Sequence, residues 1–449
     1  MLERHLQITN ARAANFDFTN ARKALLTWFD ANGRKFPWRD VPTPFRVWVS
    51  EIMLQQTTTQ TVVGYFERFL ARFPNVVSLA AASEEDVLKY WEGLGYYRRA
   101  KALRMAAIKI VEQFGGIFPS EYDDVLALPG VGRYASGAIL SFGFDKRFPI
   151  LEANTTRLHT RLTGMRVEPT RSDAQKILWN FAETWLPPLT PIRPKGVYRL
   201  INSALTDLGR LVCAPNDPSC VRCPLANFCE AKRLGIQEEI PIRKKKNVPI
   251  KIVSVAVWIS RKDLDIARKV KDSPDLSKSQ TLRESDVLLI RRSDGALWAG
   301  LWDFPRFEVA NELAAAKNLS GDLALSERLQ FFLEEEVGSE SYIGKVGRVL
   351  TTVSHSVTKY RVALRVARLA NAKLRVGLEE ERTLFNAANT ELLDLRTKKN
   401  FVPNDSPDSR VMRQCSELQW VPLDLLNLYP LSSPARRVAN FIIDASRGK

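Results

Sequence analysis

Four of the five cysteines lie close together in the sequence and could bind one metal centre. Cys213, Cys220, Cys223 and Cys229 have the spacing C-x6-C-x2-C-x5-C, whereas Cys415 stands alone. A disulfide framework is a poor explanation, because structural disulfides are rare in large intracellular chains. Four thiolates at this spacing can converge on a tetrahedral zinc or on a four-iron cluster. The spacing alone leaves both metals open for the loop 213–229.

A second chemical feature is a short glycine-containing turn in front of a helical pattern. Residues 128–139 read LPGVGRYASGAI, with glycines at 130 and 132. Glycine lets a backbone approach a ligand closely, and the N–H groups at the start of a helix can bind a phosphate. By itself the motif is a weak signal, since two such glycines also occur in ordinary helix–helix turns.

The elements that must position these residues change character near residue 240. From Thr19 to about Leu234, apolar residues recur at intervals of three and four, which is typical of helices. Residues 236–249 read as a linker with the basic run RKKK at 243–246. Beyond it the apolar period becomes two at 250–259, 286–290 and 360–366, which indicates strands. The sequence therefore predicts a mainly α domain at 19–235, the linker 236–249, and a smaller α+β domain at 250–445.

Composition excludes several classes of protein. With 45% hydrophobic and 26% charged residues, the 449-residue chain has the balance of a globular protein. No run approaches the roughly eighteen apolar residues that a membrane span requires. The formal net charge of +16 favours a polyanionic partner, either nucleic acid or, less often, an anionic membrane. We expect an intracellular protein, in the cytoplasm with the nucleoid in a bacterium, or in the nucleus or mitochondrion in a eukaryote.

Several blocks together resemble a known family. The glycine turn, the acidic residue at 152 and the cysteine spacing are similar to the helix-hairpin-helix DNA glycosylase superfamily, which includes endonuclease III. Within it, PWR at 37–39, VWVSEIMLQQT at 47–57 and GLGYY at 93–97 resemble MutY-type adenine DNA glycosylases. LWAGLWDFP at 297–305 and WVPL at 420–423 resemble the Nudix-related C-terminal domain of that family. The acidic helix at 328–338 lacks the Nudix hydrolase pattern, so we interpret this domain as a lesion-recognition module.

The resemblance implies a monofunctional enzyme of base excision repair that removes adenine mispaired with 8-oxoguanine or guanine in double-stranded DNA. It implies a helix-hairpin-helix fold with an iron–sulfur loop, acting as a monomer. It also favours a [4Fe-4S] cluster over zinc. The ligands implied for that cluster are Cys213, Cys220, Cys223 and Cys229.

The resemblance also implies catalytic roles. Glu51 would be the general acid that protonates the departing adenine, with its pKa raised by the apolar residues around it. Glu152 would stabilise the sugar cation, and Asn154 would orient the carboxylate or the lesion strand. Tyr134 stands where strand-nicking relatives have a lysine that forms a Schiff base, which a tyrosine cannot form.

One departure from the family pattern affects the chemistry. The family has aspartate in an Asp-Gly-Asn context, whereas this chain has Glu-Ala-Asn at 152–154. The carboxylate moves outward by one C–C bond, ~1.5 Å, and a misplacement of ~1 Å can cost a hundredfold in rate. Two alternatives therefore stay open: a glycosylase with altered specificity, and a catalytically weakened protein that binds the lesion.

The remaining candidates would contact DNA. Gln56 and Tyr96 match positions that fill the gap left by an extruded base. Ser354 and His355 lie in Val-Ser-His at 353–355, which resembles the family's Phe-Ser-His loop for 8-oxoguanine. The other DNA-contacting or base-contacting candidates are Trp38, Arg39, Gly130 and Gly132.

Overall fold

The computed structural model describes residues 2–190, 194–242, 248–260, 285–293, 298–309, 319, 323–335, 346–357, 360–369 and 415–447. The chain divides into two compact units. One comprises Met1–Tyr90 and Arg99–Lys246, and the other comprises Trp91–Arg98 and Asn247–Lys449. The basic run predicted at 243–246 lies outside the described residues.

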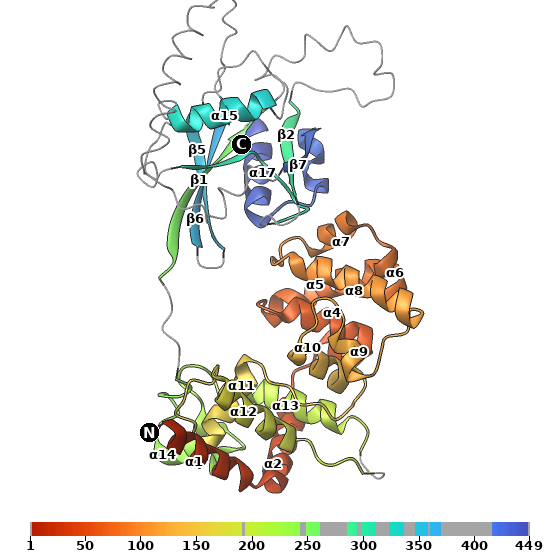
Figure 1. Ribbon diagram of the computed structural model, residues 1–449, viewed down its shortest axis with the longest axis vertical. Coiled ribbons are helices and arrows are strands. Elements are labelled where there is room, and N and C mark those ends of the chain that lie inside the picture. Colours follow the sequence, from red (N-terminus) through yellow and green to blue (C-terminus); the bar gives the residue numbers. More distant parts are fainter. Residues whose placement is uncertain are drawn as a thin grey trace, which may run out of the picture. The chain divides into compact units, whose positions relative to one another are not determined.

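The first unit is built from helices joined by short turns (Figure 1). Its first half contains α1 (Leu2–Ala14), α2 (Phe18–Asn32), α3 (Pro37–Asp40), α4 (Pro44–Leu54), α5 (Thr59–Arg72), α6 (Val76–Ala81), α7 (Glu84–Trp91) and α8 (Arg98–Phe114). Its second half contains α9 (Tyr122–Leu126), α10 (Arg133–Ala138) with a π-helical continuation (Ile139–Gly143), α11 (Ala153–Thr163), α12 (Ser172–Thr184), α13 (Val197–Leu211) and α14 (Glu230–Leu234). Helix α1 was not predicted, since the helical pattern was expected to begin at Thr19.

An aromatic core holds the second half of this unit together. Buried residues of α2, α11 and α13, among them Leu25, Leu158 and Leu205, pack in one cluster with Cys213. Phe18 lies edge-on to Trp185, with ring centroids 5.5 Å apart. The cluster therefore joins the helices that carry the site to the start of the cysteine loop.

In the residues that the structure describes, the second unit has two small sheets and two long helices (Figure 1). One sheet has the order β4-β1-β6-β5, with β1 parallel to β6 and the other pairs antiparallel; the other sheet is antiparallel, in the order β3-β2-β7. The strands are β1 (Ile250–Trp258), β2 (Val287–Arg292), β3 (Trp302–Asp303), β4 (Arg306–Val309), β5 (Val346–Val357), β6 (Tyr360–Leu369) and β7 (Cys415–Val421). The helices are α15 (Leu323–Glu335) and α17 (Ser433–Ser446), with a short 3-10 helix (Leu423–Leu428) before α17.

The alternation along β1 explains why both sheet faces are covered. Val255 and Val257 pack with α15, while Ala256 and Trp258 pack with α17. Because successive strand residues point to opposite faces, one apolar run fills two cores. The predicted mainly α plus α+β fold class is confirmed.

Two local features differ from the sequence analysis or add to it. Residues 353–355 were interpreted as a loop, but they belong to strand β5, where Ser354 pairs with Ala363 of β6. The strand continues because β5 and β6 form an antiparallel pair through this segment. Among the described helices, none is both long and apolar enough to cross a membrane.

A core substitution tests the packing under α17. We expect Leu364→Ala to lower the free energy of unfolding by about 3 kcal/mol, because the side chain is fully buried and its removal leaves a cavity. Leu350→Ala on the neighbouring strand is the matched control, since Leu350 is 42% exposed. Urea denaturation of the full chain would measure both variants, and equal losses would contradict the packing described.

Candidate active site and cysteine loop

Helix α4 places Glu51 inside the protein. Thr43 caps the helix by accepting a hydrogen bond from the Arg46 backbone N–H at 3.3 Å, and Pro44 occupies its first position. The helix is buried on nearly all sides, and Glu51 is only 7% exposed. Because the neighbouring residues of α4 are buried and mostly apolar, the Glu51 carboxyl group is shielded from water.

Burial raises the pKa of Glu51 to about 7, although a hydrogen bond from Tyr134 opposes the shift. The Tyr134 hydroxyl donates to Glu51 Oε2 at 2.7 Å. The negative charge of Glu152 raises the pKa of Glu51 further, and the positive charge of Arg39 lowers it. Burial and the Glu51 charge hold the pKa of Tyr134 well above its usual value, so Tyr134 stays a donor.

Glu152 is held by the start of helix α11. Its Oε1 accepts from the Thr155 backbone N–H at 2.9 Å, and its Oε2 accepts from the Asn154 backbone at 2.8 Å and side-chain amide at 3.0 Å. Glutamate is not among the favoured N-cap residues, yet here its longer side chain folds back over the helix end. Burial raises the pKa of Glu152, while these hydrogen bonds and Arg157 oppose the rise.

A chain of hydrogen bonds runs from Glu152 to the first cysteine. Arg157 donates from Nη2 to Asn154 Oδ1 at 2.9 Å and from Nε to the Cys213 carbonyl at 2.8 Å. Helices α11 and α13 approach closely here, because a Cβ at Gly209 would lie 2.8 Å from the Asn154 carbonyl oxygen. The start of α11 is thereby tied to the cysteine loop.

Arg39 is fixed by a residue that the sequence analysis missed. Its guanidinium forms a bidentate ion pair with the fully buried Asp207, from Nη1 to Oδ2 at 2.7 Å and from Nη2 to Oδ1 at 3.1 Å. The Arg34 backbone N–H also donates to Asp207 at 3.1 Å. The signal in the sequence was an aspartate among the apolar residues of α13, a position where a buried charge requires a partner. Trp38 is buried beside this pair and stacks on Phe36, with centroids 4.8 Å apart.

The four cysteines of the loop line one pocket. Cys213 is buried, the other three are half-buried, and all four are free thiols. Burial raises the pKa of Cys223 to about 12 and that of Cys229 to about 11, and the neighbouring cysteines add to both shifts. As placed, the described residues hold no group of three or more His, Cys, Asp or Glu that could bind a metal ion. Four sulfurs around one pocket nevertheless have the donor chemistry of a metal centre.

Arg161 adds a buried cation to that pocket, and the sequence analysis did not single it out. Its Nη1 donates to Cys213 Sγ at 3.3 Å and to the Ala214 carbonyl at 2.7 Å, and its Nε donates to the Ile240 carbonyl at 3.0 Å. A buried cation favours the thiolate form of a neighbouring cysteine. Arg161 thus places a positive charge next to a sulfur of the pocket and connects the start of the loop to Ile240.

The remaining candidates are two glycines near α10, two residues with positive φ, and two residues of strand β5. Gly130, with φ of 75°, turns the chain before α10, and a Cβ there would lie 2.7 Å from Ala102 Cβ; Gly132 caps α10. Gln56 and Tyr96 are exposed and have positive φ values of 61° and 49°. Non-glycine residues in this region are strained and cluster at functional sites. In the second unit, Ser354 is exposed, and His355 lies against Trp298 with centroids 5.7 Å apart.

The raised pKa of Glu51 has a consequence for stability. In the unfolded chain the carboxyl titrates near 4.5, and in the folded chain near 7, so the folded state binds more protons between these values. The free energy of unfolding therefore falls as the pH rises through this window. We expect Glu51→Gln to be more stable than the parent by about 3 kcal/mol above pH 7, with the advantage disappearing toward pH 4.5. Urea denaturation at several pH values measures it, and a pH-independent difference would contradict the assignment.

Two family models match the chain, one mainly in each part of the sequence. Residues 49–184 match the sequence model of the HhH-GPD superfamily of base excision DNA repair proteins, and residues 281–440 match that of the NUDIX domain. Among solved structures, a thermostable thymine-DNA glycosylase is 27% identical in sequence. The match spans 47% of this chain and 95% of the glycosylase chain, with a TM-score of 0.42.

Curated relatives match nearly two thirds of the chain. The adenine DNA glycosylase of Mus musculus is 33% identical, over 64% of this chain and 61% of that protein. The adenine DNA glycosylase of Buchnera aphidicola subsp. Schizaphis graminum is 40% identical over 285 residues, which make up 63% of this chain and 74% of the relative. The resemblance inferred from the sequence blocks is confirmed, and the chain belongs to the adenine DNA glycosylase family.

Proposed function

We propose that this enzyme, an adenine DNA glycosylase of base excision repair, removes adenine mispaired with 8-oxoguanine or guanine in double-stranded DNA, with Glu51 as general acid. The observation that carries the proposal is the buried Glu51 carboxyl with a pKa of about 7, hydrogen-bonded to Tyr134. A general acid works best when its pKa is near the working pH, because it is then protonated and still a good donor. Glu51 meets this condition only because it is buried.

The second carboxyl group supports the same reaction. Breaking the N-glycosidic bond leaves positive charge on the sugar, and a fixed carboxylate close by stabilises it. Glu152 is held by three N–H donors, from Asn154 and Thr155, which favour its ionised form. The donors oppose the rise that burial causes in the pKa of Glu152, whereas Glu51 has a pKa of about 7, so we assign the carboxylate role to Glu152 and the acid role to Glu51. Asn154 orients the carboxylate in this proposal.

The lack of a lysine beside Glu51 favours a monofunctional reaction. The residue that contacts Glu51 is Tyr134, whose hydroxyl keeps its proton and cannot form a Schiff base with the sugar. Water would then attack the sugar cation and leave an abasic site. The contacts we assign to the flipped adenine come from Trp38 and Arg39, and those to the DNA strands from Gln56, Tyr96, Gly130, Gly132, Ser354 and His355.

We also assign a [4Fe-4S] cluster to Cys213, Cys220, Cys223 and Cys229. Burial raises the pKa values of Cys223 and Cys229, so a bound metal centre is what would hold these two as thiolates. When bound, the cluster would supply a rigid cross-link for the loop and a possible electron store. Arg161 and Arg157 would bind the loop beside it through Cys213.

Single-turnover kinetics test the catalytic assignment. On duplex DNA with adenine opposite 8-oxoguanine, we expect the wild type to release adenine, and Glu51→Gln to be slower by about 10²–10⁴-fold, the usual contribution of a general acid. Alkali treatment of the product reveals abasic sites. Glu152→Asp keeps the charge and should remain active. An inactive wild type with an active Glu152→Asp variant would show a protein that has given up the chemistry. Faster release of another base than adenine would show altered specificity.

Metal analysis tests the cluster. We expect iron and sulfide in the purified protein, and their loss in Cys223→Ser, because one of four ligands is removed. Cys415→Ser is the matched control and should retain the iron, since this cysteine is far from the others in the sequence. Zinc in place of iron would refute the assignment, and an unchanged iron content in Cys223→Ser would remove that residue from the ligand set.

A further inference from the structure

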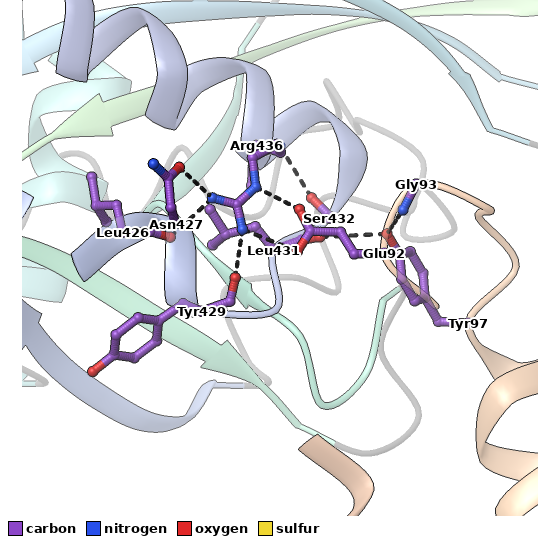
Figure 2. A network of polar contacts seen from close by, with 10 residues as sticks. Glu92, Gly93, Tyr97, Leu426, Asn427, Tyr429, Leu431, Ser432 and Arg436 are labelled. Atoms are coloured by element: carbon purple, nitrogen blue, oxygen red, sulfur yellow. Dashed lines mark hydrogen bonds and ion pairs between the residues drawn. The ribbon is translucent and has the colours of Figure 1, made fainter. Parts of the chain in front are cut away.

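Helix α17 of the second unit carries an arginine that binds the segment Trp91–Arg98 of the same unit. Figure 2 shows Arg436 among its partners: its guanidinium pairs with both carboxylate oxygens of Glu92, through Nε and through Nη2 at 3.0 Å. The same guanidinium donates to the carbonyls of Leu426 at 2.9 Å and Tyr429 at 2.6 Å. Both charges are largely shielded from water, with 20% and 17% of the side chains exposed. An arginine held on several sides fixes Glu92 in a defined position.

The segment bound in this way is a tight loop. Gly93 and Gly95 have φ values of 97° and 70°, and the Trp91 indole donates to the Gly95 carbonyl at 3.1 Å. The Tyr97 hydroxyl donates to the Leu431 carbonyl at 3.4 Å and accepts from the Gly93 backbone N–H at 3.4 Å (Figure 2). Tyr97 is 4% exposed, whereas its neighbour Tyr96 is 55% exposed. The loop is therefore anchored on both sides of the residue that it presents outward.

The residue after Arg436 in α17, Arg437, contacts strand β5, which carries the proposed lesion contact Ser354. Arg437 Nη2 donates to the Ser354 carbonyl of β5 at 2.9 Å. Val353, beside Ser354, packs in the same core cluster as Ala435 and Val438 of the helix. Strand β5 is thus fixed to α17 by a side chain–backbone hydrogen bond and by apolar packing.

From these contacts we infer that α17 sets the separation between Tyr96 and Ser354, and that Arg436 is a positioning residue for binding of the 8-oxoguanine strand. The inference rests on the proposed function, which assigns Tyr96 and Ser354 to contacts with the DNA strands, with Ser354 on the 8-oxoguanine. Consecutive residues of one helix hold the two supports, so the spacing is set by a rigid element with a rise of about 1.5 Å per residue. Without the Glu92 ion pair, Tyr96 would lose its fixed distance from the serine.

Two measurements on the full-length holoenzyme test the inference. The first is the ratio of single-turnover rates on adenine opposite 8-oxoguanine and adenine opposite guanine. We expect Arg436→Ala and Glu92→Ala to lower this ratio by about tenfold, since small misplacements at a distance from the chemistry reduce rates strongly. The conservative variant Arg436→Lys keeps a cationic donor for Glu92 and should retain part of the ratio. Arg447→Ala, at the exposed end of α17, is the matched control and should leave the ratio unchanged.

The second measurement is amide hydrogen exchange without DNA, which does not depend on activity. We expect Arg436→Ala to increase exchange in the peptide 93–97 while strand β1 keeps its protection. Unchanged exchange at 93–97 would overturn the inference. An increase of exchange in β1 equal to that at 93–97 would also overturn it, because Arg436 would then stabilise the whole unit and not this loop in particular. If the wild type releases no adenine, the proposed function fails, and the exchange result still decides whether Arg436 positions the loop. An unchanged rate ratio in a folded Arg436→Ala would refute the role in lesion recognition.

Discussion

The active-site arrangement depends on the removal of one carboxyl group from water. Glu51 lies on a helix whose other buried residues are apolar or small, and this environment raises its pKa to about 7. A buried carboxylate without partners would be costly, and a buried carboxylic acid is much less so. Tyr134 and Arg39 moderate the shift, so that the group can still give up its proton near neutral pH. The ion pair with Asp207 keeps the Arg39 charge in place.

The second carboxyl group is controlled by a helix terminus and not by burial alone. The start of α11 offers backbone N–H groups that have no partner within the helix, and Glu152 accepts from two of them. Burial raises the pKa of Glu152 and these donors oppose the rise, whereas burial raises the pKa of Glu51 to about 7. Asn154 and Arg157 continue the hydrogen bonds to Cys213, so the start of α11 and the cysteine loop share one support. A structural change in the cysteine loop would therefore alter the hydrogen bonds that hold Glu152.

In the second unit, the contacts of α17 hold the backbone that carries two exposed side chains. Exposed residues gain little from core packing, so their placement depends on the backbone that carries them. For Ser354 that backbone is a strand bonded to α17, and for Tyr96 it is a loop bonded to α17 through Glu92. The positive φ of Tyr96 shows that the loop holds a conformation its sequence would not favour in isolation.

Much of the protein followed from the sequence by itself. The change of apolar period near residue 240 predicted a helical part followed by a sheet-containing part, and the cysteine spacing and the blocks around Glu51 predicted the family. These signals are local, and local patterns follow directly from the geometry of helices and strands. Helix α1 and the strand conformation of 353–355 were missed, because their formation depends on packing against other elements and on pairing with β6. Only the tertiary structure decided four other features. They are the pKa of Glu51, the hydrogen bonds that hold the longer side chain of Glu152, the partner of Arg39, and the contacts of α17 with two segments. The Glu152 hydrogen bonds are local, reaching only two and three residues along the chain, but a glutamate is an unusual residue for this cap. The other features depend on residues more than 80 positions apart or on how far water is excluded, and a local sequence pattern records neither.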